Sequence, residues 1–169
     1  MRIAMIGTGY VGLVSGVCLS DFGHEVVCVD TNAEKVGRLR AGEVPIYEPG
    51  LDEMMARNAS AGRLVFTTAL GEALEGAEAV FIAVGTPTRR GDGHADLTYV
   101  YAAAEEVART LTGPAVVVCK STVPVGTNAE IARRIRAANP EADVEVASNP
   151  EFLREGAAIE PTDDSAEDA

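Results

Sequence analysis

The chain contains no tryptophan, only three cysteines and two histidines, and aromatic residues make up 5% of it. It is also poor in basic residues: 14 Lys and Arg stand against 26 Asp and Glu, which gives a formal net charge of −12. This charge argues against a nucleic-acid partner. No C-x-x-C pair is present, and Cys18, Cys28 and Cys119 each lie in or beside an apolar segment. We therefore expect free cysteines that pack as small hydrophobic side chains. His94 has no second candidate ligand nearby, so we predict no metal site.

A long apolar run is missing as well, so no segment is expected to span a membrane. No charged leader precedes the first apolar segment, which favours a cytoplasmic protein without a membrane partner. The 169 residues fit one domain of ordinary size, which we assign to residues 1–160. Residues 161–169 are acidic and have no hydrophobic periodicity, and we expect a disordered tail there.

What the sequence does have is a glycine-rich stretch at its start. The apolar residues 2–6 lead directly into Gly7-Thr-Gly-Tyr-Val-Gly12. In a strand–turn–helix unit, Gly7 allows a tight turn, Gly9 lets a pyrophosphate approach the backbone, and Gly12 lets the helix lie close to the strand. Free N–H groups and the positive dipole at the start of the helix then hold the phosphates. This G-x-G-x-x-G pattern is weak evidence alone, so its surroundings decide.

The surroundings support dinucleotide binding. Residues 25–30 form a second apolar segment with Asp30 at its end, about 20 residues after Gly9. A carboxylate at this place binds the adenosine ribose and would repel a 2′-phosphate, so NAD is favoured over NADP. Asp30 could instead cap the next helix, but Thr31 and Glu34 form a capping box there.

Further along, apolar segments alternate with helical patterns, which predicts a parallel sheet covered on both faces. We predict an α/β fold of the Rossmann type, doubly wound, with a mostly parallel six-stranded sheet in the strand order 3-2-1-4-5-6. Two helices have predicted apolar faces, and a capping box at Thr127 and Glu130 opens a third. The two faces consist of Val11, Val14, Cys18 and Phe22, and of Val100, Ala104, Val107 and Leu111.

Five motifs stand in order along residues 1–160. They are Gly7-Thr-Gly-Tyr-Val-Gly12, Pro45-Ile-Tyr-Glu-Pro-Gly-Leu51, Val84-Gly-Thr-Pro87, Lys120-Ser-Thr-Val-Pro-Val-Gly-Thr127 and Asn149-Pro-Glu-Phe-Leu-Arg-Glu-Gly156. Together they resemble the UDP-glucose 6-dehydrogenase family of nucleotide-sugar dehydrogenases. That family oxidises the primary alcohol at C6 of its sugar to a carboxylate with NAD. The resemblance therefore implies NAD as cofactor and UDP-glucose as substrate.

The resemblance also implies roles for individual residues. Thr122 would position a water or a substrate oxygen at the reacting carbon, and Glu155 would assist proton transfer during thioester hydrolysis. The residues implied to contact NAD are Gly7, Gly9, Tyr10, Val11, Gly12, Asp30, Lys35, Thr86, Thr122 and Glu155. The residues implied to bind the nucleotide sugar are Glu151, Phe152, Leu153, Arg154 and Glu155. By themselves, Thr122 could simply end a strand, Glu155 could be an exposed helix acid and Lys35 a solvated lysine.

The resemblance ends after Ile159-Glu160. Family members continue into a central helix and a C-terminal domain with the nucleophilic cysteine, and the full-length family implies a homodimer. We expect this chain alone to bind NAD without completing the oxidation. Alternatives are a GDP-mannose or UDP-N-acetyl-hexosamine dehydrogenase, or a non-catalytic NAD-binding fragment. The residues Lys120-Ser-Thr-Val-Pro-Val-Gly126 favour UDP-glucose.

Overall fold

Most strands form where apolar residues run without interruption, as expected for a parallel sheet that is covered on both faces, and the edge strand at Val144–Ser148 is the least buried. The computed structural model describes residues 1–89, 91, 93–150 and 152–159. The tail predicted at 161–169 lies outside the described residues. The strands are β1 (Arg2–Ile6), β2 (Glu25–Val29), β3 (Leu64–Thr67), β4 (Ala79–Ile82), β5 (Ala115–Cys119) and β6 (Val144–Ser148).

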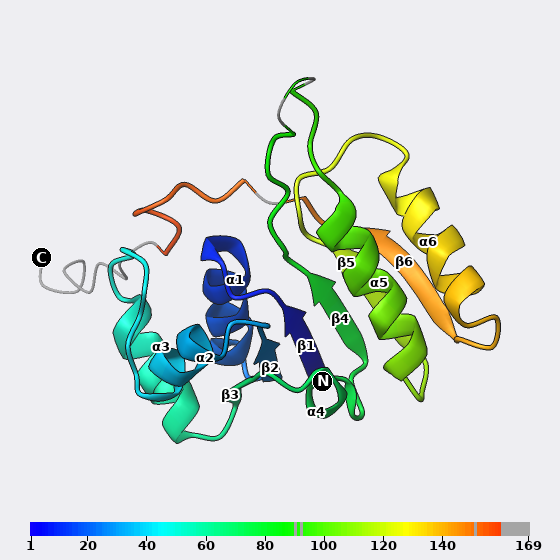
Figure 1. The fold of residues 1–169 in the computed structure, drawn as a ribbon. Coiled ribbons are helices and arrows are strands. Elements are labelled where there is room, and N and C mark those ends of the chain that lie inside the picture. The colour runs from blue at the N-terminus through cyan, green and yellow to red at the C-terminus, as the bar shows by residue number, and fades with distance from the viewer. Residues whose placement is uncertain (90, 92, 151, 160–169) are drawn as a thin grey trace, which may run out of the picture.

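All six strands are parallel and lie in the order β3-β2-β1-β4-β5-β6, which confirms the predicted topology (Figure 1). At the carboxyl end of β1, Ile6 is paired with Val29 of β2 and with Ile82 of β4. The loops after these three strands therefore begin side by side. This is the place where the strand order reverses and where doubly wound folds bind their ligands.

Helices cover both faces of the sheet (Figure 1). Alternate strand residues point to opposite faces, so Ile3 and Met5 belong to one core cluster, and Ala4 and Ile6 belong to the other. The helices α1, α2 and α3 pack on the first cluster, and α4, α5 and α6 pack on the second. Their bounds are α1 (Tyr10–Asp21), α2 (Ala33–Arg40), α3 (Leu51–Ser60), α4 (Leu70–Leu74), α5 (Thr98–Thr110) and α6 (Thr127–Ala138).

The apolar face predicted for α1 is confirmed in part, whereas the face predicted for α5 is buried as expected. Val14 is buried and the half-buried Val11 and Cys18 pack on the same core cluster, but Phe22 is 79% exposed. The helix also turns small residues toward the sheet. A Cβ atom on Gly16 would lie 2.7 Å from the Cys28 Sγ atom, so helix and strand approach more closely than larger side chains allow. The buried residues of α1 are Gly12, Leu13, Val14, Ser15, Gly16, Val17 and Ser20.

Both predicted capping boxes are wrong. Helix α2 is capped by Asn32, whose side-chain oxygen accepts a hydrogen bond from the Lys35 amide at 3.0 Å. Helix α6 follows Gly126, which adopts a left-handed backbone conformation with φ 91°, and the Thr127 hydroxyl donates to the Pro124 carbonyl instead. In each case a neighbouring residue competes successfully for the same helix end.

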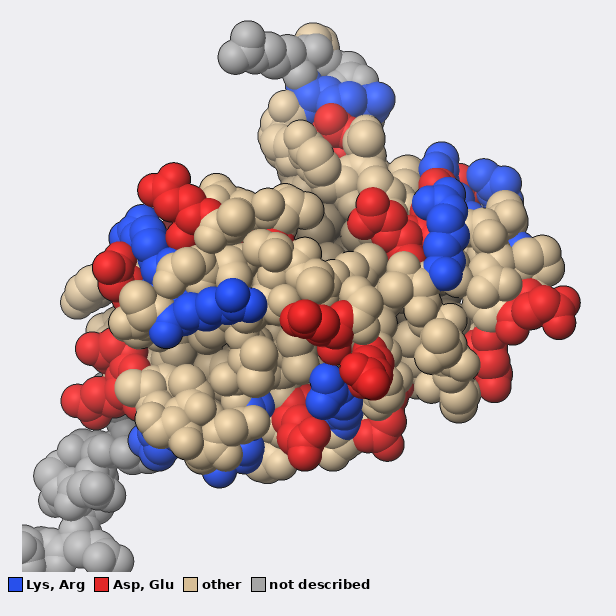
Figure 2. Space-filling model, turned by 60° about the horizontal axis from the view of Figure 1, so that its bottom comes forward, with Lys and Arg blue, Asp and Glu red and all other residues tan. Residues whose placement is uncertain are grey.

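Within the described residues, no helix has the length and apolar character needed to cross a bilayer. Figure 2 shows acidic and basic side chains interspersed with uncharged ones on one face of the molecule. The surplus of acidic residues is therefore not gathered in one patch on that face.

Candidate functional site

The glycine turn after β1 is packed against the neighbouring strand. The Gly7 amide donates to the Val29 carbonyl at 2.9 Å, and Gly7 has a φ of 98°, which side chains rarely allow. A Cβ atom on Gly7 would lie 2.6 Å from the Ala83 carbonyl oxygen, and one on Gly12 would lie 1.9 Å from the Gly7 carbonyl oxygen. The fold itself therefore requires glycine at both positions.

Gly9 is different, because a Cβ atom there would meet no protein atom within 4 Å. Its backbone lies in the extended region, with φ −69° and ψ −173°, which any residue adopts without strain. Gly9 also precedes the first residue of α1 and is exposed. Neither packing nor conformation explains a glycine here, whereas the close approach of a ligand does.

Asp30, at the end of β2, is held by a network of hydrogen bonds. Its Oδ2 atom accepts from the Thr8 amide at 3.0 Å, from the Thr8 hydroxyl at 2.7 Å and from the Lys35 ammonium at 2.7 Å. Its Oδ1 atom accepts from the Asn32 amide at 3.0 Å. Asp30 therefore joins the glycine turn to the start of α2, but the cap of this helix is Asn32, so the alternative that Asp30 only caps the helix is wrong.

This network keeps Asp30 ionised. Burial alone would raise the pKa of its carboxyl group, but the Lys35 ammonium and the donors of Asn32 and Thr8 outweigh it and lower the pKa to about 2. The Lys35 side chain is 30% exposed and that of Asp30 is 12% exposed. The alternative of a merely solvated Lys35 is therefore wrong.

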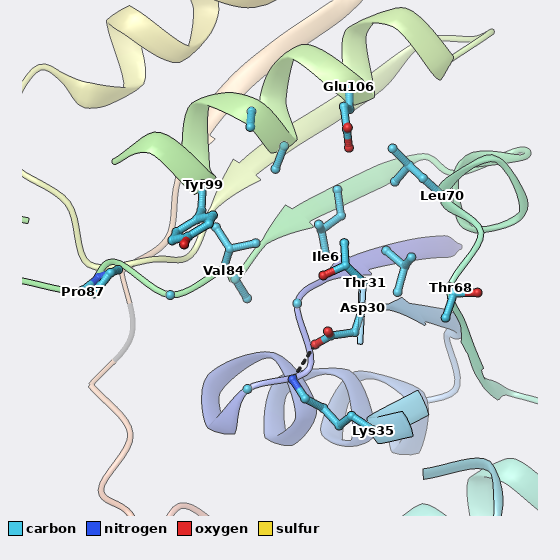
Figure 3. A pocket seen from close by; sticks show the side chains of 17 residues that line it. Ile6, Asp30, Thr31, Lys35, Thr68, Leu70, Val84, Pro87, Tyr99 and Glu106 are labelled. Atoms are coloured by element: carbon cyan, nitrogen blue, oxygen red, sulfur yellow. Dashed lines mark hydrogen bonds and ion pairs between the residues drawn. The ribbon is translucent and has the colours of Figure 1, made fainter. Parts of the chain in front are cut away.

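A pocket of about 540 Å³ opens beside this network, between the ends of β1, β2 and β4 and the helix α5 (Figure 3). Asp30, Thr31 and Lys35 form its polar side, where the dashed line marks the Asp30–Lys35 ion pair (Figure 3). Its apolar lining comes mainly from Ile6, Val29, Leu70, Ala83, Val84 and Ala103. Of the residues implied to contact NAD, the pocket brings together Gly7, Gly9, Asp30 and Lys35.

The wall from α5 was not anticipated from the sequence. Tyr99, Ala102, Ala103 and Glu106 line the pocket and follow each other at the spacing of one helical stripe. This stripe lies beside the buried face that begins at Val100. The small residues Ala102 and Ala103, next to an apolar face, were the signal in the sequence that could have indicated this wall.

The other implied site residues lie in exposed loops. The Thr86 hydroxyl donates to the Thr122 carbonyl at 3.3 Å, so the loops after β4 and β5 contact each other. Thr122 and Glu155 are both exposed, and among the described residues no hydrogen bond joins them. Tyr10 and Val11 are half-buried at the start of α1, outside the pocket lining.

The segment that follows β6 carries the residues implied to bind the nucleotide sugar. Glu151 lies outside the described residues. Phe152 is 92% exposed, Arg154 is exposed, and Leu153 packs against the core cluster of α1, α2 and α3. In Figure 1 this orange-red segment crosses from β6, beyond the ends of the strands, to the side of α1 and α3.

The three cysteines are free thiols. Cys28 and Cys119 are buried and Cys18 is half-buried, as expected for hydrophobic packing. Burial raises the pKa of the Cys28 thiol to about 12 and also raises those of Cys119 and Cys18. None of the three is therefore favoured as a thiolate nucleophile.

A strand–glycine turn–helix unit with an ordered acid at the next strand is typical of dinucleotide-binding domains. The family described as "UDP-glucose/GDP-mannose dehydrogenase family, NAD binding domain" matches residues 1–167. The chain belongs to this family. The family name thus confirms the resemblance drawn from the five motifs and the cofactor NAD.

Relatives of the UDP-glucose/GDP-mannose dehydrogenase family share much of the sequence. The UDP-glucose 6-dehydrogenase of Rhizobium meliloti is 65% identical over 160 residues, which are 95% of this chain and 37% of that protein. UDP-glucose 6-dehydrogenase YwqF of Bacillus subtilis is 52% identical and is covered to the same 37%. The chain therefore spans a little over a third of these relatives.

Solved structures of the family have the same fold. A UDP-glucose dehydrogenase from Pyrobaculum islandicum superposes with a TM-score of 0.89 and 48% identity, over 94% of this chain and 38% of that one. A GDP-mannose dehydrogenase from Pseudomonas aeruginosa superposes with a TM-score of 0.88 and 38% identity over the same shares. The fold is thus shared by members named for different nucleotide sugars.

Proposed function

We propose that this chain binds NAD in the pocket beside Asp30 and supplies the cofactor half of an enzyme that oxidises UDP-glucose at C6 to UDP-glucuronate. The observation that carries the proposal is Gly9. Its missing side chain serves neither packing nor backbone geometry, and it lies at the amino end of α1, next to the pocket. A pyrophosphate at this place explains the glycine.

The adenosine half of NAD fits the part of the pocket near β2. The Oδ1 atom of Asp30 accepts one hydrogen bond, from Asn32, and has room for a ribose hydroxyl. Asp30 is anionic at neutral pH and disfavours a 2′-phosphate. The aliphatic side chains of Ile6, Leu70 and Val84 provide apolar surface for the adenine ring.

The reacting half would lie over the loops that follow β4 and β5. NAD held there by the glycine turn and Asp30 would supply the acceptor for the hydride of the sugar carbon. Thr86 would contact the nicotinamide half, and the Thr122 hydroxyl would contact NAD and hold a water or a sugar oxygen near the reacting carbon. Glu155 would contact the cofactor and take a proton through water. The nucleotide sugar would be bound by Glu155 and its neighbours, Glu151 and Phe152–Arg154.

UDP-glucose is preferred as the substrate because relatives at 65% and 52% identity bear the name UDP-glucose 6-dehydrogenase. The remaining length of these relatives has no counterpart in the 169 residues. The three cysteines here do not offer a thiolate, so we propose that the chain alone binds NAD but does not complete the oxidation. For the whole enzyme we propose a cytoplasmic homodimer.

Isothermal titration calorimetry with NAD and NADP tests the cofactor assignment. We expect saturable binding of NAD and weaker binding of NADP, and the absence of heat with both coenzymes would overturn the proposal.

Absorbance at the NADH band, with UDP-glucose, GDP-mannose or a UDP-N-acetyl-hexosamine, tests the reaction. We expect no steady NADH formation from the 169-residue chain, and continuous turnover would refute its proposed dependence on further residues.

A further inference from the structure

Glu48 is a buried acidic residue with no role in the proposed chemistry. It lies in the loop between α2 and α3 and is 5% exposed. Its carboxylate accepts four hydrogen bonds, two at each oxygen. Oε2 accepts from the Tyr10 hydroxyl at 2.5 Å and the Gly156 amide at 2.9 Å, and Oε1 accepts from the Ala158 and Ile159 amides at 2.8 and 2.9 Å.

These partners are far from Glu48 in the sequence. Three of them belong to the segment that crosses from β6 to the side of α1 and α3 (Figure 1). Leu153, Ala158 and Ile159 of this segment also pack on the core cluster of α1, α2 and α3. The Glu48 carboxylate thus fastens the end of a segment that starts at the opposite edge of the sheet.

The four donors also determine the charge state of Glu48. Burial alone would raise the pKa of its carboxyl group, but the hydrogen bonds from Tyr10 and the three amides outweigh it and lower the pKa. Burial and the adjacent carboxylate raise the pKa of Tyr10 to about 12, so its phenol keeps its proton and remains a donor. An anionic carboxylate facing four donors is a strong and directional anchor.

Tyr10 connects this anchor to the glycine turn. It is the first residue of α1, directly after Gly9. Its hydroxyl also lies 3.2 Å from the Arg154 carbonyl oxygen. Glu155 therefore lies between Arg154, whose carbonyl oxygen is close to the Tyr10 hydroxyl, and Gly156, whose amide donates to Glu48.

We propose that Glu48 is a positioning residue, which holds the Glu155 segment at the dinucleotide turn and, through Tyr10, couples the ordering of this segment to NAD binding. The inference rests on the proposed function, since the coupling has a purpose only if NAD binds at Gly9 and Glu155 works beside it. The coupling is reciprocal by thermodynamic necessity. If NAD lowers the opening equilibrium of the segment by some factor, the open form of the segment binds NAD more weakly than the closed form by the same factor.

The test combines amide hydrogen exchange with NAD titration of the 169-residue chain. In the unchanged chain, the amides of Gly156, Ala158 and Ile159 should be protected, and NAD should slow their exchange further. In Glu48→Gln, we expect their exchange to accelerate on the order of tenfold to a hundredfold, while amides of β1 and β4 keep their rates. NAD affinity should fall, by at most the factor by which NAD slows exchange in the unchanged chain, because the full loss requires a segment that is mainly open.

Glu43→Gln is the matched control. It removes the same charge from the same loop, but Glu43 is exposed and pairs with Arg38 at 2.8 Å. We expect unchanged exchange at residues 156–159 and unchanged NAD affinity. Acceleration equal to that in Glu48→Gln would show an unspecific effect of charge and overturn the proposal.

Tyr10→Phe keeps the inference testable if Glu48→Gln does not fold, because it removes only one hydroxyl group. It leaves the three amide bonds to Glu48, so these amides should stay protected without NAD, but NAD should no longer slow their exchange. A Tyr10→Phe chain with the full NAD effect would refute the coupling, and so would Glu48→Gln with unchanged exchange at residues 156–159. A failure of the proposed function is distinct, because the unchanged chain would then show no NAD binding at all.

Discussion

The two ends of the proposed cofactor site are built differently. At the adenosine end, four hydrogen bonds hold a single carboxylate, that of Asp30, in one orientation before any ligand arrives. At the reacting end, the side chains of Thr122 and Glu155 are exposed. The first end is therefore preorganised by this chain alone, which lowers the entropic cost of binding. At the second end the chain anchors the backbone beside Glu155, but no comparable network holds the side chains of Thr122 and Glu155 among the described residues.

The largest effect is expected from the glycine that the turn itself requires. Gly12→Ala would place a methyl group 1.9 Å from the Gly7 carbonyl oxygen, which forces α1 away from β1. We expect a loss of about 3 kcal/mol or more in the free energy of unfolding, and a melting temperature lower by roughly 10 °C. Thermal unfolding followed by circular dichroism measures this. A fully stable variant would contradict the close packing of this turn.

Gly9→Ala separates ligand binding from folding at the same turn. The new methyl group meets no protein atom and the backbone conformation suits alanine, so the melting temperature should shift by less than about 2 °C. NAD affinity should fall on the order of a hundredfold, because the methyl group would occupy the place proposed for the pyrophosphate. Calorimetry measures the affinity, and retention of tight NAD binding by Gly9→Ala would remove the main support for the proposed site.

At the adenosine end, Asp30 should make the free energy of unfolding depend on pH. The pKa of Asp30 is about 2 in the folded chain and about 3.9 when unfolded, so the unfolded state binds more protons between these values. The contribution of Asp30 to stability is complete above about pH 4 and is lost as the pH falls toward 2, by roughly 1–2 kcal/mol.

Urea unfolding at pH 5, 4 and 3 measures this dependence, with Asp30→Asn as the comparison. The variant should lose less stability than the unchanged chain over this range, because its amide does not titrate. Equal losses in both chains would mean that Asp30 is not held as an ion in the folded state.

The smallest effect is expected at the reacting end. In Thr122→Ala the exposed hydroxyl is lost, while the backbone carbonyl that accepts from Thr86 remains. We expect a melting temperature unchanged within about 1 °C and a change in NAD affinity of at most about threefold. Calorimetry on this variant sharpens the comparison, since a tenfold loss would show that this chain alone already shapes the reacting end.

The parts of the structure that could be predicted from the sequence depend on local signals. Apolar runs specify the strands, and the glycine turn followed by an acid about 20 residues later specifies the binding end of the sheet. The helix ends were harder, because Thr31 and Asn32 are both good caps and only the backbone path decides between them. The apolar face of α1 was predicted only in part, because this helix also buries small residues such as Gly16 and Ser20, which carry little hydrophobic periodicity.

The anchor at Glu48 illustrates what local patterns do not contain. An acid between tyrosine and proline in a polar loop is typical of a solvated residue. Its four donors come from the start of α1 and from residues more than a hundred positions away. Only the crossing of the segment over the end of the sheet brings them together. The wall formed by α5 is similar, because only the strand order brings Tyr99 and Glu106 to the pocket.

The two core clusters lie on opposite faces of the sheet, and the pocket draws Ile6 and Ala103 from one and Ala83 from the other. A dinucleotide lying across this boundary would contact both hydrophobic layers. Because it would bind only the folded sheet, it should raise the free energy of unfolding of the whole domain.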